Sequence, residues 1–221
     1  SNSSNVAMAI ITLTTDLGTK DHYVGVLKGA ILSQCPDATI VDISHEIPTY
    51  DILKAAFTLK NAFADFPEGT IHILGVNPEI SEKAVSLVIG HQGQYFVGAD
   101  NGVFSLIFEE KPAKIIQVDI MVNPDALTFP TKDIFTKAAC HIAKGGTLEM
   151  IGKPATEWNE KGLFRAVSLD NIIKGMVIHI DHYGNIITNI DYNFFHAFGQ
   201  GRDFKIEFRR GDYDITNISK V

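Results

Sequence analysis

The sequence lacks the features that would place the chain in a membrane or on a nucleic acid. It has no run of about 18 consecutive apolar residues, which a membrane-spanning helix would need. The first residues, SNSSNVAM, do not show the charged-then-apolar order of a signal peptide. The formal net charge is −7, so no basic surface for nucleic acid or anionic lipid is expected. We therefore expect a cytoplasmic protein with neither a membrane nor a nucleic-acid partner.

Cysteine is scarce, and the common catalytic motifs are missing. Cys35 and Cys140 lie far apart in helical patterns, which predicts two reduced thiols in the core and no disulfide or thiolate metal site. The eight histidines form no HxxxH or HxH cluster, so no metal site is expected. The chain also contains no GxSxG, GxxxxGK[ST] or HExxH motif, and no GxGxxG after a strand. No nucleophilic constellation can therefore be identified from these motifs.

What the sequence does contain is an alternation of apolar strands and amphipathic helices. With 45% hydrophobic residues it can build a substantial core. Asp21 and Asp51 are expected to cap the first two helices, because Asp at an N-cap accepts a backbone hydrogen bond. Further helices are expected near 104–108 and 132–144. The predicted strands are 9–13, 39–43, 70–76, 84–89, 94–97 and 115–120.

This order of elements predicts an α/β fold whose mostly parallel sheet is flanked by helices. We assign residues 6–150 to this N-terminal domain. Residues 151–165 contain Pro154 and Trp158 and are interpreted as a linker. From residue 172 onward the pattern is typical of strands with tight glycine turns, so 166–221 is predicted to be a smaller antiparallel β domain. Because the pattern stops at Val221 without a closing element, we expect this domain to be incomplete.

Asp16 is the first candidate for a ligand-binding residue. It follows the first strand directly, and α/β proteins bind ligands beyond the carboxyl ends of their strands. A carboxylate there can accept two hydrogen bonds from a diol such as the 2′ and 3′ hydroxyls of a ribose. Asp also commonly caps its own turn, and the sequence leaves both interpretations open.

Three further stretches could carry chemistry. Residues 75–78 follow the third strand, and Thr131 lies before a helix whose N-cap it could provide. Residues 181–185, DHYGN, offer a carboxylate for an ammonium group, an aromatic face and an amide, but they equally fit a plain hairpin turn. His45 is the best placed histidine, and a lone loop histidine is more often structural or solvated.

Taken together, these stretches resemble one family. The motifs are TTDLGTKDHYVGVLKGAI, IVDISHEI, FPEGTIHI, GADNGV, DIFTKAACHIAKG and IDHYGNIITNI, in this order from about 9 to 189. They resemble the S-adenosylmethionine hydroxide adenosyltransferases and the related adenosyl-chloride and adenosyl-fluoride synthases. The resemblance implies an N-terminal α/β domain, a C-terminal β domain, and a homotrimer with its sites between subunits. It also implies displacement of methionine from the ribose 5′ carbon of S-adenosylmethionine, which is the substrate, so no cofactor is expected.

The resemblance assigns binding roles to four residues, and the DHYGN stretch itself adds the aromatic face of Tyr183 as a fifth candidate for substrate binding. Asp16 would hold the ribose hydroxyls. Asp181 and Asn185 would bind the methionine part, Asp181 at its ammonium group. Tyr50 lies where the halide-using branch has an aromatic residue near the substrate.

The same alignment shows departures at the nucleophile site. The water-using branch has an Asp-Arg-His set, and here Asn77, Lys83 (or Ala84) and Pro130 occupy those positions. Asn cannot act as a base, and Lys lacks the planar fork of Arg. Thr131 lies where the halide-using branch has a hydroxyl or glycine.

We therefore predict an enzyme that cleaves S-adenosylmethionine with water at a reworked site formed by Asn77, Lys83 and Thr131. The alternatives are a non-catalytic protein that binds S-adenosylmethionine or adenosine, a halide-dependent synthase, and a purely structural trimer.

Overall fold

The computed structural model describes residues 8–76, 84–120, 129–160 and 167–207. The chain forms two compact units that divide between Lys161 and Gly162. Within the described residues, no helix has both the length and the apolar character needed to cross a membrane.

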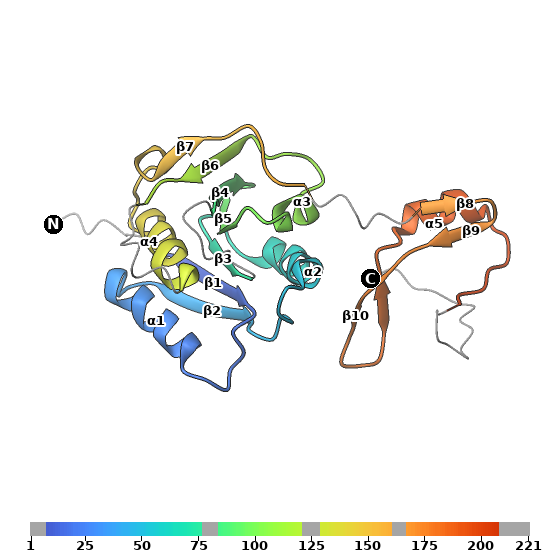
Figure 1. Ribbon diagram of the computed structural model, residues 1–221, viewed down its shortest axis with the longest axis horizontal. Helices are drawn as coiled ribbons and strands as arrows, with labels where there is room; N and C mark the ends of the chain where they lie inside the picture. The colour runs from blue at the N-terminus through green and yellow to red at the C-terminus, as the bar shows by residue number, and fades with distance from the viewer. Residues whose placement is uncertain (1–7, 77–83, 121–128, 161–166, 208–221) are drawn as a thin grey trace. The chain divides into compact units, whose positions relative to one another are not determined.

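A seven-stranded sheet is the middle layer of the first unit (Figure 1). Its strand order is β2-β1-β3-β5-β4-β6-β7. The pairs β2–β1, β1–β3 and β3–β5 are parallel, whereas β4 runs antiparallel to both β5 and β6, and β7 runs antiparallel to β6. The strands are β1 (Ile10–Thr15), β2 (Thr39–Ser44), β3 (Ile71–Gly75), β4 (Ser86–His91), β5 (Gln94–Ala99), β6 (Lys114–Val118) and β7 (Gly152–Pro154).

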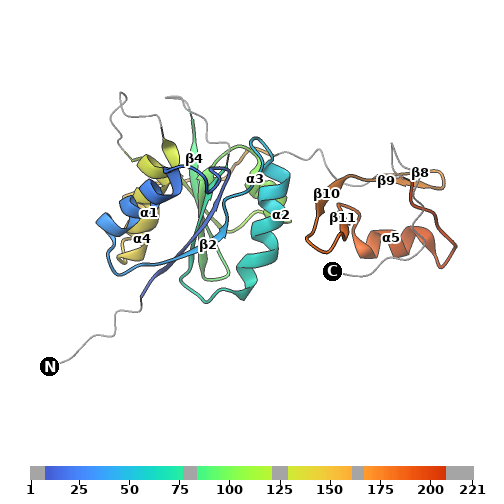
Figure 2. The same ribbon diagram turned by 90° about the horizontal axis from the view of Figure 1, so that it is seen from below.

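Helices cover both faces of this sheet (Figure 2). On one face lie α1 (Tyr23–Gln34) and α4 (Thr136–Ala143), and on the other lie α2 (Ile52–Ala62) and α3 (Val103–Ile107). Each face has its own apolar core, because successive side chains along each strand point to opposite faces of the sheet. The expected α/β fold with helices on a mostly parallel sheet is confirmed.

The second helix forms as its sequence predicts. Asp51 accepts a hydrogen bond from the backbone N–H of Lys54 at 2.9 Å, which satisfies one of the free amides at the helix start. Ala55 and Leu59, one helical turn apart, are buried against the sheet. The predicted cap and apolar face of α2 are confirmed.

The first strand and helix differ from the prediction in two details. β1 extends to Thr15, beyond the predicted end at Leu13, because β3 supplies pairing partners for Thr14 and Thr15. The predicted Asp21 cap is wrong: α1 begins at Tyr23, and the N-cap position is His22 without a side-chain hydrogen bond. No side-chain cap therefore marks the start of this helix.

Part of the expected linker belongs to the first unit. Residues 152–154 form the edge strand β7, and Trp158 is buried against Phe108 with nearly parallel rings. The aromatic side chain adds to the apolar core on the α2 face of the sheet.

The second unit contains two antiparallel strand pairs, which confirms a small antiparallel β part near the C-terminus. The expectation that this region is all strand is wrong, because the helix α5 (Tyr192–Gly199) follows the second pair. Asp191 caps it by accepting from the N–H of Phe194 at 3.1 Å. The strands are β8 (Val167–Leu169), β9 (Ile172–Lys174), β10 (Val177–Ile180) and β11 (Ile186–Thr188).

Candidate active site

The carboxyl ends of the parallel strands meet at one edge of the first unit's sheet. Asp16 follows β1 there, His45 follows β2, and β3 ends at Gly75. The backbone N–H of Asp16 donates to the carbonyl of Gly75 at 3.3 Å, which ties the turn after β1 to the end of β3. The half-buried carboxylate of Asp16 thus lies at the edge where α/β proteins bind ligands.

His45 is structural and not solvated, which is one of the two roles that its sequence context favours. It is 5% exposed, and its ring nitrogens lie 2.7 Å from the hydroxyl of Thr15 and 2.7 Å from a carboxylate oxygen of Asp42. The sequence alone did not identify these two partners. The available signal was the spacing of Asp42 and His45 at the carboxyl end of a strand that neighbours β1.

The turn after β5 is also fixed to this edge. Asn101 donates from Nδ2 to the carbonyl of Val76 at 3.1 Å and accepts from the N–H of Val103 at 3.1 Å. Asn159 in turn binds Asp100 through two hydrogen bonds, at 2.8 and 2.7 Å. The GADNG turn therefore holds the end of β3 as well as reversing the chain.

Thr131 packs against the end of β3, and its predicted role as an N-cap is wrong. It is the first residue of η3 (Thr131–Phe135), a π-helical turn before α4, and the N-cap position is Pro130 without a side-chain bond. Such turns often mark functional sites in helical segments. Thr131 is 1% exposed, and a Cβ placed on Gly75 would lie 2.7 Å from its Cγ2 atom. This close approach explains why β3 ends in glycine.

Tyr50 has an unusual backbone for an aromatic residue. It lies between β2 and α2 with φ of 67°, in the left-handed region that costs free energy for residues with a Cβ. Its carbonyl accepts from the N–H of Ile52 at 3.2 Å, and its side chain is 75% exposed. The ring is therefore open to solvent.

Two residues of the predicted nucleophile site, Asn77 and Lys83, lie outside the described residues. Val76 follows β3, and Ala84 precedes β4. Because β4 begins opposite the end of β5, with Ser86 paired to Ala99, both flanking residues lie at the edge that carries Asp16.

Asp181, Tyr183 and Asn185 lie in the turn between β10 and β11 of the second unit, so this stretch does form a hairpin turn. One carboxylate oxygen of Asp181 accepts from the N–H groups of Tyr183 and Asn185 at 2.9 and 2.8 Å, and the other accepts from Asn185 Nδ2 at 2.9 Å. The hydrogen bonds from the side chain and backbone of Asn185 hold the pKa of the Asp181 carboxyl below its usual value. A fixed, ionised carboxylate results, beside the exposed ring of Tyr183.

The described site residues therefore form two groups. Asp16, Tyr50 and Thr131 belong to the first unit, and Asp181, Tyr183 and Asn185 belong to the second.

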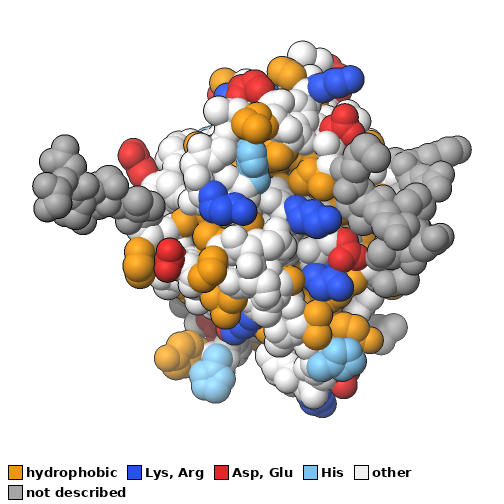
Figure 3. All heavy atoms as spheres, turned by 90° about the vertical axis from the view of Figure 1, so that its left-hand side faces the viewer, with side chains coloured by type: hydrophobic (Ala, Val, Ile, Leu, Met, Phe, Trp, Pro, Cys, Tyr) orange, Lys and Arg blue, Asp and Glu red, His pale blue; other side chains and the backbone are white. Residues whose placement is uncertain are grey.

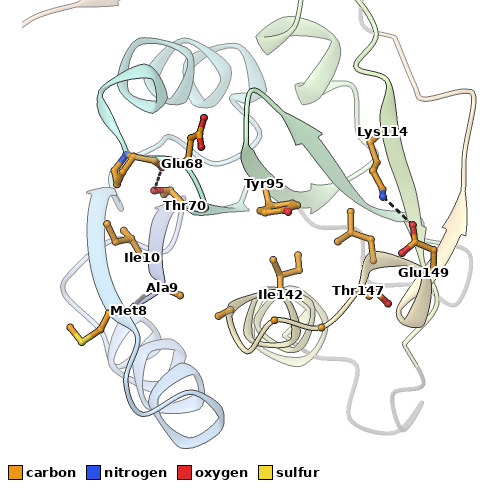
Figure 4. Close-up of a pocket in the computed structure, with 16 residues that line it drawn as sticks. Met8, Ala9, Ile10, Glu68, Thr70, Tyr95, Lys114, Ile142, Thr147 and Glu149 are labelled. Atoms are coloured by element: carbon orange, nitrogen blue, oxygen red, sulfur yellow. Dashed lines mark hydrogen bonds and ion pairs between the residues drawn. The ribbon is translucent and has the colours of Figure 1, made fainter. Parts of the chain in front are cut away.

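A cavity of about 510 Å³ lies at the opposite edge of the sheet (Figure 4). It is lined by Ile10, Thr70 and Tyr95 near the starts of β1, β3 and β5, and by the ion pair of Lys114 and Glu149 at 3.0 Å. Since Asp16 follows the end of β1, this cavity is separate from the site residues.

The face of the molecule drawn in Figure 3 shows charges of both signs. On the face drawn in Figure 3, basic and acidic side chains are interspersed with hydrophobic ones. Among the described residues, no group of three His, Cys, Asp or Glu side chains is arranged to hold a metal ion.

Comparison with known proteins gives consistent matches along the chain. Residues 11–152 match the SAM hydroxide adenosyltransferase N-terminal domain, and residues 175–220 match the C-terminal domain of the same family. The chain is 38% identical over 187 residues to an (R)-S-adenosyl-L-methionine hydrolase from Methanocaldococcus jannaschii, covering 82% of this chain and 66% of that protein. It is also 26% identical over 234 residues to a fluorinase from Nocardia brasiliensis, covering 92% of this chain and 78% of the fluorinase.

Solved structures show the same fold. The crystal structure of an uncharacterized conserved protein from Thermotoga maritima superimposes with a TM-score of 0.79 at 30% identity, covering 97% of this chain and 83% of that one. Because both domains of this family match the chain in order, the chain belongs to the SAM hydroxide adenosyltransferase family.

Proposed function

We propose that this protein cleaves S-adenosylmethionine with water to give adenosine and L-methionine. The observation that carries the proposal is the carboxylate of Asp16 at the carboxyl edge of the sheet, in a chain that is 38% identical to a protein named as an S-adenosylmethionine hydrolase. In this reaction the bond between C5′ and sulfur breaks as water oxygen bonds to C5′. Methionine leaves with the sulfur electron pair, and the attacking water loses one proton.

In this proposal some residues bind the substrate and others position the attacking water. Asp16 holds the ribose hydroxyls, and Tyr50 lies near the substrate. Asp181 pairs with the methionine ammonium, with Asn185 and Tyr183 beside it. The sulfonium already activates the carbon, so the site has chiefly to place a water in line and exclude others. Asn77, Lys83 and Thr131 form that water site, and the proposed reaction needs no cofactor besides its substrates, S-adenosylmethionine and water.

A second candidate is a protein that binds S-adenosylmethionine or adenosine without turning it over. The replacement of the family's Asp-Arg-His set by Asn77, Lys83 and Pro130 favours it, because none of these can act as a carboxylate or imidazole base. A halide-dependent synthase is the third candidate, supported by Thr131 and by the similarity to a fluorinase.

Product analysis by liquid chromatography and mass spectrometry tests these candidates. The protein is incubated with S-adenosylmethionine, with and without chloride, beside Asp16→Ala and the control Asp21→Ala. The exposed Asp21 lies in the same loop and caps no helix. Adenosine and methionine formed by the protein and the control, and lost in Asp16→Ala, are expected. Intact substrate with measurable calorimetric binding would support the binding protein, and 5′-chloro-5′-deoxyadenosine would support the synthase.

Restoring the family's nucleophile set provides an independent test. The combined substitution Asn77→Asp, Lys83→Arg and Pro130→His should raise water-dependent cleavage, because a positioned base is worth roughly 100 to 10,000-fold. An unchanged rate would argue against the assignment of these positions.

We also propose a homotrimer that acts in the cytoplasm. Tyr23, Val26 and Leu32 on the outer side of α1 are each more than two-fifths exposed, which suits a covered interface. The free, buried thiols of Cys35 and Cys140 suit a reducing compartment. Light scattering should give three times the chain mass of 24.3 kDa, and a monomer mass would reject the trimer.

A further inference from the structure

His45 contacts both ends of the turn that carries Asp16. Its Nδ1 lies 2.7 Å from the hydroxyl of Thr15, the residue before Asp16. Its backbone carbonyl accepts from the N–H of Gly18, two residues after Asp16, at 2.7 Å. Thr15 is fully buried and His45 is 5% exposed, so little water competes for these bonds.

A charged pair behind the ring orients it. The Nε2 atom of His45 lies 2.7 Å from one carboxylate oxygen of Asp42, and the ammonium of Lys28 lies 2.6 Å from the other. Burial alone would raise the pKa of Asp42, but the hydrogen bonds from Lys28 and His45 and their charges lower it overall. An ionised Asp42 can only accept, so Nε2 carries a proton, and in the neutral ring Nδ1 accepts from the Thr15 hydroxyl.

Four backbone groups of the turn make hydrogen bonds. The carbonyl of Thr15 accepts from Ile47, and the N–H groups of Asp16, Leu17 and Gly18 donate to Gly75, to the Thr15 hydroxyl and to His45. A carboxylate that accepts two hydrogen bonds from a diol needs a fixed position, since a displacement of about 1 Å can cost about 100-fold. The contacts of His45 supply two of these fixed points.

We propose that His45 is a positioning residue for Asp16, with Asp42 and Lys28 orienting its ring, and that this network sets the selectivity of the site for the ribose diol. The inference rests on the proposed role of Asp16 in binding ribose. His45 does not touch the substrate. It acts through the backbone and hydroxyl of Thr15, which set the position from which the Asp16 carboxylate meets the two hydroxyls.

The test is the ratio of calorimetric affinities for adenosine and for 2′,3′-dideoxyadenosine, which lacks both hydroxyls. The variants His45→Leu and Thr15→Val remove the bond between the two side chains, whereas His45→Asn and Thr15→Ser keep an acceptor or a hydroxyl in place. We expect His45→Leu and Thr15→Val to reduce the affinity ratio about tenfold or more, because they weaken the binding of adenosine alone. His45→Asn and Thr15→Ser should restore most of the ratio. Thr19→Val, which removes an exposed hydroxyl of the same loop, should leave the ratio unchanged.

The outcomes separate the two claims. Failure of the full chain to bind adenosine, or a ratio that survives Asp16→Ala, would refute the proposed role of Asp16 and with it this inference. A ratio that collapses in Asp16→Ala but persists in His45→Leu and Thr15→Val would overturn the positioning role alone. Equally weaker binding of both ligands, or a reduced affinity ratio in Thr19→Val, would show only a general disturbance of the loop. Either result would also overturn the positioning role of His45. Thermal unfolding of each variant confirms that it is folded.

Discussion

A buried histidine in the centre of the sheet should make the first unit sensitive to acid. His72 in β3 is fully buried, and its Nδ1 lies 2.6 Å from the hydroxyl of Thr12. Its Nε2 lies 2.6 Å from Gln94 Oε1, and the amide nitrogen of Gln94 donates to the carbonyls of Phe63 and Phe66. Because Gln94 uses its nitrogen elsewhere, its oxygen accepts and the ring donates from Nε2. Burial lowers the pKa of His72, so the ring is neutral at pH 7.

The size of the effect follows from the pKa. Burial lowers the pKa of His72 from 6.5 to about 4, although the hydrogen bond to Gln94 opposes this. Between these two values the unfolded chain binds more protons than the folded one, so the free energy of unfolding rises with pH. The contribution of neutral His72 to the free energy of unfolding is complete above pH 6.5 and is lost as the pH falls toward 4. The difference between the two pKa values corresponds to about 3 kcal/mol of free energy of unfolding.

Urea unfolding followed by the fluorescence of Trp158 measures this contribution, because this single tryptophan is buried in the first unit. We compare the protein with His72→Phe, and with Phe96→Leu as a control that damages the same packing without a titrating group. The stability difference between the protein and His72→Phe should shrink by about 3 kcal/mol from above pH 6.5 to near pH 4. For Phe96→Leu the difference should stay constant. If the stability difference between the protein and His72→Phe does not change with pH, the assigned acid sensitivity of His72 is wrong.

Two other predictions concern packing and thiol chemistry. Gly75→Ala should destabilise the first unit by about 1 to 3 kcal/mol in urea unfolding, because its Cβ would lie 2.7 Å from Thr131. The control Gly90→Ala, whose Cβ would meet Lys114 at an ordinary 3.4 Å, should change stability little, and equal losses would contradict the packing argument. Burial, with the nearby Cys35 thiol, raises the pKa of Cys140 to about 11, so iodoacetamide should leave it unmodified in the folded protein and modify it in urea. Mass spectrometry of the intact chain measures this, and rapid modification without urea would contradict it.

Local patterns in the sequence predicted much of the fold. The cap and apolar face of α2 depend on residues within one or two helical turns, so Asp51, Ala55 and Leu59 suffice to define them. The end of α4 is equally local: Gly145 adopts a positive φ of 84°, as its place after the helix predicts.

The features that the sequence did not predict depend on distant pairing. His45 meets Thr15 only because β1 and β2 are neighbours in the sheet, and the two residues are 30 apart in the chain. The start of α1 at Tyr23 has no side-chain cap, so the local signal offered by Asp21 does not predict it. The helix α5 was missed because its short aromatic segment follows two strand pairs and was interpreted with them.

The source of the oxygen in the product shows whether this protein cleaves S-adenosylmethionine with water. The protein is incubated with S-adenosylmethionine in water enriched in oxygen-18, and the adenosine is examined by mass spectrometry. We expect adenosine that carries the heavy isotope in its 5′ hydroxyl, formed together with methionine and absent from the Asp16→Ala reaction. Intact S-adenosylmethionine, or adenosine without the label, would contradict cleavage by water at this site.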